Sequence, residues 1–150
     1  MFAALALVVA SCGRTARIEG VVADAPSSKL VVKALDLNKY QVLDTVCTDA
    51  SGRFTYKVEM EKGQPEFIYV YRNDVKIASL LLNEGDKVKV TADTLGQWTV
   101  EGSEESVKLA QVEADYAAAL NAMTTADQSE IVKEYVNYYR SRVKYVMSNP

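Results

Sequence analysis

Short runs of β-prone residues, in which hydrophobic and polar positions alternate, follow one another over residues 17–102. Residues 53–59 (RFTYKVE) show this best, because polar or charged residues separate Phe54, Tyr56 and Val58. A period of two is typical of a strand with one face in the core and the other in solvent. Polar turns divide the runs. The pattern predicts strands at residues 18–22, 29–35, 41–48, 53–59, 66–72, 76–82, 87–91 and 97–101.

The spacing of these strands predicts the fold class. Many short strands with no long helical pattern between them are typical of all-β proteins whose sheets pack face to face or close into a barrel. The connections are too short to hold the crossover helix of a βαβ unit. We therefore expect a mainly-β domain at residues 17–102, an antiparallel β-sandwich or barrel of about eight strands.

The hydrophobic period changes after residue 102 and predicts a helix. Ser103 is a suitable N-cap, and Glu104 and Glu105 would lie favourably at the positive end of the helix dipole. Hydrophobic residues then recur at helical spacing of three and four: Leu109, Val112, Tyr116, Leu120 and Met123.

A second helix is predicted after a break at residues 124–126. Asp127 and Glu130 resemble a capping box, and a hydrophobic stripe follows. The short join predicts an antiparallel two-helix hairpin. We expect the tyrosines beside this stripe to pack against the sheet or between the helices; the alternative is that they form a ligand or partner surface. The stripe consists of Val132, Val136, Tyr139, Val143 and Val146, widened by Tyr135, Tyr138 and Tyr145.

The first eleven residues are typical of a lipoprotein signal peptide. Residues 1–10 (MFAALALVVA) are uncharged and match the apolar core of an export signal, whereas a membrane-spanning helix takes about 20 apolar residues. Residues 9–12 (VASC) resemble a bacterial lipobox, which implies cleavage before Cys12 and acylation of its thiol. The basic region that normally precedes such a core is missing. The alternative is a buried strand that ends in cysteine.

Acylation of Cys12 would tether the chain to a membrane, because two or three acyl chains give firm anchoring. No acidic cluster of the kind associated with surface export follows Cys12. We therefore expect a lipid-anchored protein of the cell envelope, at the periplasmic face of the outer membrane. Cys47 would then have no partner in the chain, and we expect it to be a buried apolar residue rather than a reactive thiol.

Charge and composition exclude several kinds of function. The net charge of −3 argues against a general nucleic-acid binder, because such proteins need an excess of positive charge. Because the chain has no histidine, a Ser-His-Asp or Cys-His nucleophile system is impossible, and so is a metal site that uses imidazole. We predict no catalytic residues, no metal and no cofactor. Carboxylates are the remaining acid–base groups, but the most notable ones fit ordinary turns: Asp44, Asp49, Glu84 and Asp86.

The strand aromatics are the candidate binding residues. Trp98, Tyr69 and Tyr71, together with Tyr56, could line a site for a peptide or a glycan. The alternative is that they belong to the core, as alternate aromatics on strands often do. Two positions, Thr94 and Thr45, match the Bacteroidetes O-glycosylation pattern of Asp, Thr and an aliphatic residue.

The order of several short motifs resembles a known family. The motifs are residues 18–22 (IEGVV), 43–46 (LDTV), 49–54 (DASGRF), 83–86 (NEGD) and 100–103 (VEGS). Together they resemble the N-terminal β-domain of unknown function in Bacteroidetes lipoproteins, which usually carry a thioredoxin-like, thiol:disulfide interchange domain further along. The Trp-Cys-x-x-Cys motif of that domain does not occur in these residues, so only the anchor at Cys12 carries over.

The resemblance implies a function and a domain order. We expect a non-catalytic, lipid-anchored domain that tethers or docks a thioredoxin-like oxidoreductase, with residues 103–150 as a helical linker toward a missing C-terminal domain. Its partners would be the membrane and a thioredoxin-like domain or redox protein. The alternative is a stand-alone extracytoplasmic binding module for a peptide or a glycan.

Overall fold

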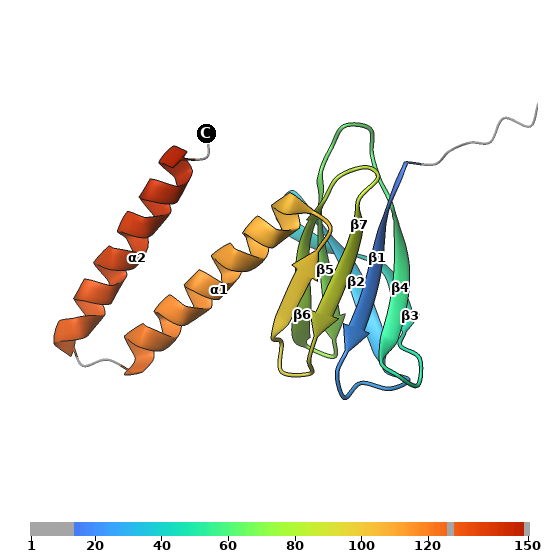
Figure 1. Ribbon diagram of the computed structural model, residues 1–150, viewed down its shortest axis with the longest axis horizontal. Coiled ribbons are helices and arrows are strands. Elements are labelled where there is room, and N and C mark those ends of the chain that lie inside the picture. The colour runs from blue at the N-terminus through green and yellow to red at the C-terminus, as the bar shows by residue number, and fades with distance from the viewer. Residues whose placement is uncertain (1–13, 126–127, 149–150) are drawn as a thin grey trace, which may run out of the picture.

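The computed structural model describes residues 14–125 and 128–148 and contains eight strands followed by two helices (Figure 1). This confirms the mainly-β fold, as a sandwich rather than a closed barrel. Each predicted strand is present, with ends shifted by at most three residues. The strands are β1 (Thr15–Val22), β2 (Lys29–Asp36), β3 (Lys39–Cys47), β4 (Arg53–Glu59), β5 (Glu66–Arg72), β6 (Val75–Leu82), β7 (Lys87–Ala92) and β8 (Trp98–Glu101).

The strands form two four-stranded sheets, ordered β4-β1-β7-β8 and β3-β2-β5-β6. All pairs are antiparallel except β1 and β7, which run parallel with Ile18 opposite Val88. The predicted antiparallel arrangement therefore holds for every pair except this one. Between β1 and β7 the chain forms β4 of the same sheet and all four strands of the second sheet. These strands replace a crossover helix and allow β7 to run in the same direction as β1.

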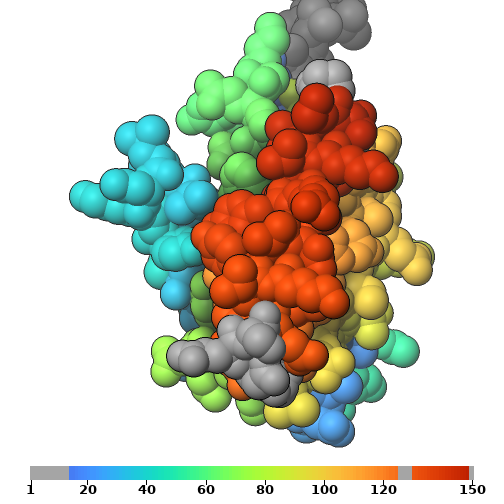
Figure 2. All heavy atoms as spheres, turned by 90° about the vertical axis from the view of Figure 1, so that its left-hand side faces the viewer, coloured from blue at the N-terminus to red at the C-terminus, as the bar shows by residue number. Residues whose placement is uncertain are grey.

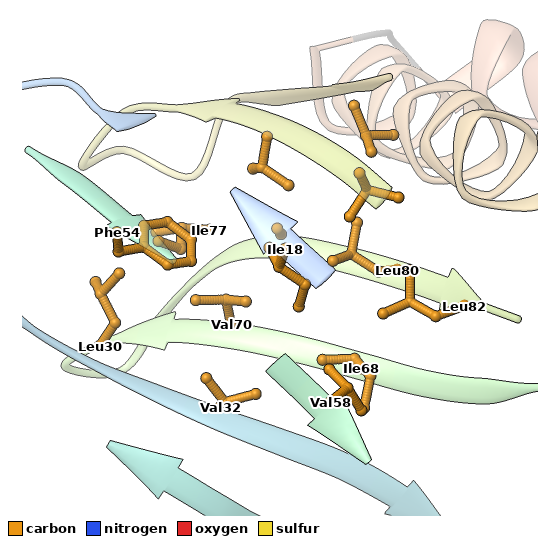
Figure 3. Close-up of a cluster of buried hydrophobic side chains, with 14 of the residues drawn as sticks. Ile18, Leu30, Val32, Phe54, Val58, Ile68, Val70, Ile77, Leu80 and Leu82 are labelled. Carbon is orange, nitrogen blue, oxygen red and sulfur yellow. The ribbon is translucent and has the colours of Figure 1, made fainter. Parts of the chain in front are cut away.

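The core lies between the two sheets and is made by the inward positions of the alternating strands (Figure 3). Phe54 on β4 lies over Gly20 on β1, where a Cβ atom would overlap the phenyl ring. Gly52, in the turn before β4, has φ +75° and lies against the Val22 carbonyl group. The largest fully buried side chains are Ile18, Leu30, Ile68, Ile77, Leu80 and Leu82.

Helix α1 (Glu104–Thr125) covers the outer edge of β6, where strand backbone would otherwise be unpaired. Ser103 caps the helix as predicted, because its Oγ accepts a hydrogen bond from the Ser106 N–H at 3.3 Å. The buried Ser106 hydroxyl donates to the Leu81 carbonyl oxygen at 2.9 Å and accepts from the Leu81 N–H at 3.1 Å. Ser103 Oγ also donates to the Leu81 carbonyl oxygen at 3.2 Å, so two serines attach the first turn of α1 to the edge strand.

Helix α2 (Gln128–Ser148) runs antiparallel to α1 and lies on the far side of it from the sandwich (Figures 1 and 2). This confirms the hairpin; Asp127 lies outside the described residues. The expected packing of the tyrosines is right for Tyr138, whose ring lies 5.9 Å from that of Tyr116 on α1, and wrong for Tyr135 and Tyr145, which are exposed. Over residues 14–125 and 128–148, neither helix has the length and apolarity to cross a membrane. Exposed stripe residues are Val132, Val136, Tyr139, Val143 and Val146.

Candidate binding site: a tyrosine–lysine face and its groove

Three tyrosines meet on the outer face of the sheet β3-β2-β5-β6. Tyr69 and Tyr71 are two residues apart on β5, so both side chains point outward while Val70 between them points into the core. Tyr40 on β3 reaches the same place, with its ring edge-on to Tyr69 at a centroid distance of 5.1 Å. Strand pairing therefore brings together residues that are 29 to 31 positions apart in the sequence.

Two lysines complete this surface, which we call the tyrosine–lysine face: Lys33, Tyr40, Tyr69, Tyr71 and Lys76. The Lys33 ammonium lies 4.2 Å from the centre of the Tyr71 ring, within the range of a cation–π contact. The Lys76 ammonium lies 5.9 Å from the centre of the Tyr69 ring. The face thus offers phenol hydroxyls and two cations from four neighbouring strands.

A groove adjoins this face where α1 leaves the sandwich. It has a volume of about 730 Å³ and lies between the start of β8 and α1. Trp98 of β8 lines it, and the same side chain packs partly against the core. Lys76 and Glu113 stand together on its wall, 2.8 Å apart, and Tyr116 lies further along α1.

The environment of Tyr69 and Tyr71 disfavours their ionised phenolate forms. Burial raises the pKa of Tyr69, and Tyr40, Glu113 and Tyr71 nearby raise it further. Burial likewise raises the pKa of Tyr71, with a contribution from its hydrogen bond with Tyr40. A phenol hydroxyl can both donate and accept hydrogen bonds, so this surface can bind polar groups of a ligand.

The predicted aromatics fall into two groups. Lys76 connects Tyr69 and Tyr71 with Trp98, because its ammonium lies 5.9 Å from the centre of the Tyr69 ring and it lines the groove together with Trp98. Tyr56 instead packs against the core. The pattern of the sequence did not predict Tyr40, Lys33, Lys76 or Glu113 as site residues. Their alternation marked the strand residues as outward-facing, but only the strand order and the position of α1 bring them together.

The candidate carboxylates do not converge. Asp49 lies beside the end of β1, where it accepts hydrogen bonds from the N–H groups of Ser51 (2.7 Å) and Arg53 (2.9 Å). Asp86 lies beside the start of β1 and accepts from Asn83 at 2.9 Å. The other two carboxylates also have partners: Asp44 accepts a hydrogen bond from the Thr45 N–H, and Glu84 forms an ion pair with Arg14 at 3.6 Å.

The remaining candidates are scattered. Thr45 is exposed on the edge strand β3, and Thr94 is half-buried in the turn between β7 and β8. The expected burial of Cys47 was wrong: its side chain is exposed, because the neighbouring Val46 packs against the core and Cys47 points to the other face of the edge strand β3. The predicted anchor, Cys12, lies outside the described residues. Among residues 14–125 and 128–148, no three Cys, Asp or Glu side chains group as metal ligands would.

The comparison with protein families identifies the domain. Residues 16–109 match the family model described as a domain of unknown function, DUF4369. The chain belongs to the DUF4369 family. No curated protein matches the sequence.

The DUF4369 match runs from β1 to the first turns of α1. It therefore contains the whole tyrosine–lysine face and Trp98, while Glu113, Tyr116 and α2 follow it. The motifs that carried the resemblance are structural in this domain. For example, Gly102 has φ +93° and lies against the Lys87 carbonyl group, where a side chain would not fit.

Proposed function

We propose that this DUF4369 domain is a non-catalytic docking domain of the cell envelope, anchored by lipid at Cys12. Its tyrosine–lysine face and groove bind an extended peptide segment of a partner protein. The observation that carries the proposal is the position of Lys76, which joins the Tyr69 ring to the groove of Trp98. A concave, partly apolar surface with a few convergent polar groups is typical of a binding site.

The chemistry of the face favours a peptide over a glycan. A sugar would stack on a free aromatic face, but the Lys33 ammonium lies over the Tyr71 ring and the Tyr40 ring abuts that of Tyr69. The lysines and phenols instead suit carbonyl and carboxylate oxygens. Trp98 and Tyr116 suit an apolar side chain, and Glu113 adds an acceptor at the groove wall.

The start of β1, which follows the proposed anchor in the chain, and the groove lie at opposite ends of the sandwich. The Gly85 N–H, three residues after β6, donates a hydrogen bond to Thr15 at the start of β1. Lys76 lies at the other end of β6, about 25 Å away by the rise of eight strand residues. A chain tethered at Cys12 would therefore hold its groove away from the membrane, open to partners in the periplasm.

A thioredoxin-like thiol:disulfide oxidoreductase is the partner that the resemblance of the motifs to Bacteroidetes lipoproteins supports. The domain would tether and position such an enzyme and contribute no reactive group of its own. Local hydrogen bonds or ion pairs occupy the four candidate carboxylates, which supports a non-catalytic role. O-glycosylation at Thr94 or Thr45 would be consistent with a location in the cell envelope.

The test is binding of the full chain to a random peptide array and to an oligosaccharide array. We expect peptides with acidic and apolar residues to bind and oligosaccharides to stay at background. Lys76→Glu should abolish the signal because it reverses the charge at the junction of face and groove. Lys89→Glu on the outer face of the other sheet should keep it. Binding to oligosaccharides alone, or peptide binding that survives Lys76→Glu, would overturn the proposal.

A further inference from the structure

The hydrophobic stripe of α2 is turned away from its own hairpin partner. Toward α1 the helix presents Glu134, Asn137, Tyr138 and Ser141, across a shallow hollow floored by small α1 residues. Tyr138 is the main aromatic contact and lies 5.9 Å from Tyr116 on α1. Five other residues are 44% to 65% exposed; we call them the α2 seam: Val132, Val136, Tyr139, Val143 and Val146.

The spacing of the seam is that of a coiled coil. Its members are separated by four, three, four and three residues, which keeps them in register with a second helix. The seam extends over about 21 Å, two full heptads. The β-branched Val136 and Val143 occupy equivalent positions one heptad apart. A helix whose exposed face contacts only solvent would not be expected to keep apolar residues at heptad spacing on that face.

Cations flank the seam on both sides. Lys133 and Arg140 occupy one flank, and Tyr135 and Arg142 occupy the other. Neither flank holds a carboxylate in the two heptads; Glu134 lies on the side facing α1. Among the described residues none of the three cations forms an ion pair, and Arg142 makes only a cation–π contact with Tyr145 at 5.6 Å.

We propose that the α2 seam docks an acidic amphipathic helix of a partner protein. The apolar stripe of that helix packs on the seam, and carboxylates beside its stripe pair with Lys133, Arg140 and Arg142. Flanking charges of this kind set partner choice in coiled coils. This surface is separate from the tyrosine–lysine face and gives the domain a second, independent contact.

The charges and the residue types argue against two other occupants. Two copies of this chain, seam to seam, would gather both sets of cations along one interface with no carboxylate between them. An anionic membrane would also attract the cations, but interfacial helices insert Trp, Phe or Leu. The exposed face of α2 consists of valine, tyrosine and methionine.

The probes are two synthetic helical peptides of three heptads with the same Val and Leu core positions. One carries Glu at all flanking positions and the other carries Lys. Fluorescence anisotropy with the full chain should show binding of the Glu peptide and at least tenfold weaker binding of the Lys peptide. The affinity for the Glu peptide should fall as salt rises, because exposed charge pairs are screened.

Two kinds of variant localise the effect. Val143→Glu should abolish binding, whereas Val42→Glu on β3 should not; these valines are 58% and 59% exposed. A triple variant, Lys133→Glu with Arg140→Glu and Arg142→Glu, should reverse the preference toward the Lys peptide. Circular dichroism of each variant checks that the helices remain folded.

Three outcomes would overturn the proposal. The first is equal binding, or no binding, of the two peptides to the wild-type chain. The second is a dimer in light scattering that Val143→Glu dissociates, which would make a second copy the occupant. The third is α2-dependent binding to phosphatidylglycerol vesicles while neither peptide binds, which would make the membrane the occupant.

Discussion

The Lys76 ammonium lies 2.8 Å from the Glu113 carboxylate, and this ion pair joins β6 to α1 across 37 positions of sequence. Both side chains are about one-third exposed. This ion pair lies where the tyrosine–lysine face meets the groove. It therefore fixes the distance between β6 and α1 at the groove. Its role in the proposed function is geometric rather than a large contribution to stability.

Removing this ion pair should affect binding far more than folding. Lys76→Met keeps the aliphatic stem and removes the charge. Partly exposed ion pairs contribute little, so we expect the free energy of unfolding to change by less than about 1 kcal/mol. Peptide binding should weaken at least tenfold. Chemical denaturation and titration of the same sample measure both, and Lys108→Met, which breaks the exposed pair with Glu104, should change neither.

Gly20→Ala should destabilise the sandwich, because the new methyl group would overlap the Phe54 ring. Overpacking of this kind costs about 1–3 kcal/mol. The double variant Gly20→Ala with Phe54→Leu should lose less stability than the sum of the single variants, since the smaller side chain makes room for the methyl group. Urea denaturation measures the coupling. Additive losses would show that the two residues do not share this space.

Ser106→Ala should loosen the attachment of α1 to the sandwich. It leaves the Leu81 N–H without its partner, at a cost of about 1–3 kcal/mol, whereas the Leu81 carbonyl oxygen keeps the hydrogen bond from Ser103 Oγ. Hydrogen exchange of the Leu81 amide should speed up, while that of Val90 in the opposite sheet should change only with global stability. Ser141→Ala, an exposed serine on α2, serves as the control. Unchanged exchange at Leu81 would contradict the assigned contact.

Asp49 should make folding stability depend on acid pH. The N–H groups of Arg53 and Ser51 hold the pKa of its carboxyl below the usual value of 3.8. Its stabilising effect is therefore complete above that value and is lost as the pH falls through the lower folded-state pKa. Asp49→Asn should flatten this part of the pH–stability curve, whereas Ser51→Ala should keep the wild-type slope. Thermal melts from pH 2 to pH 6 test this.

The strands could be predicted because each is encoded locally. Residues 53–59 alternate cleanly, and Asp49 and Gly52 mark the turn before them. The helix start at Ser103 could be predicted as well, because an N-cap hydrogen bond involves only residues close in sequence. The parallel pairing of β1 with β7 could not be predicted, since it depends on which strands become neighbours after the second sheet has formed.

The candidate site was predictable only in part for the same reason. Tyr69 and Tyr71 share a face by their spacing, but the approach of Tyr40 depends on the order β3-β2-β5. Lys76 meets Glu113 only because α1 covers β6. On α2, the stripe was visible in the sequence, but periodicity does not say which face a helix turns toward its neighbour. In the structure Tyr138 and Ser141 face α1, and the valines of the stripe are exposed.

The measurement that tests the central claim most directly is calorimetric titration of the full chain with the strongest peptide from the array. The account predicts binding by the wild-type chain, at least tenfold weaker binding by Tyr69→Ala and by Lys76→Glu, and unchanged binding by Lys89→Glu. Equal affinities across all four proteins, with their folds intact, would contradict the assignment of the tyrosine–lysine face as the binding surface.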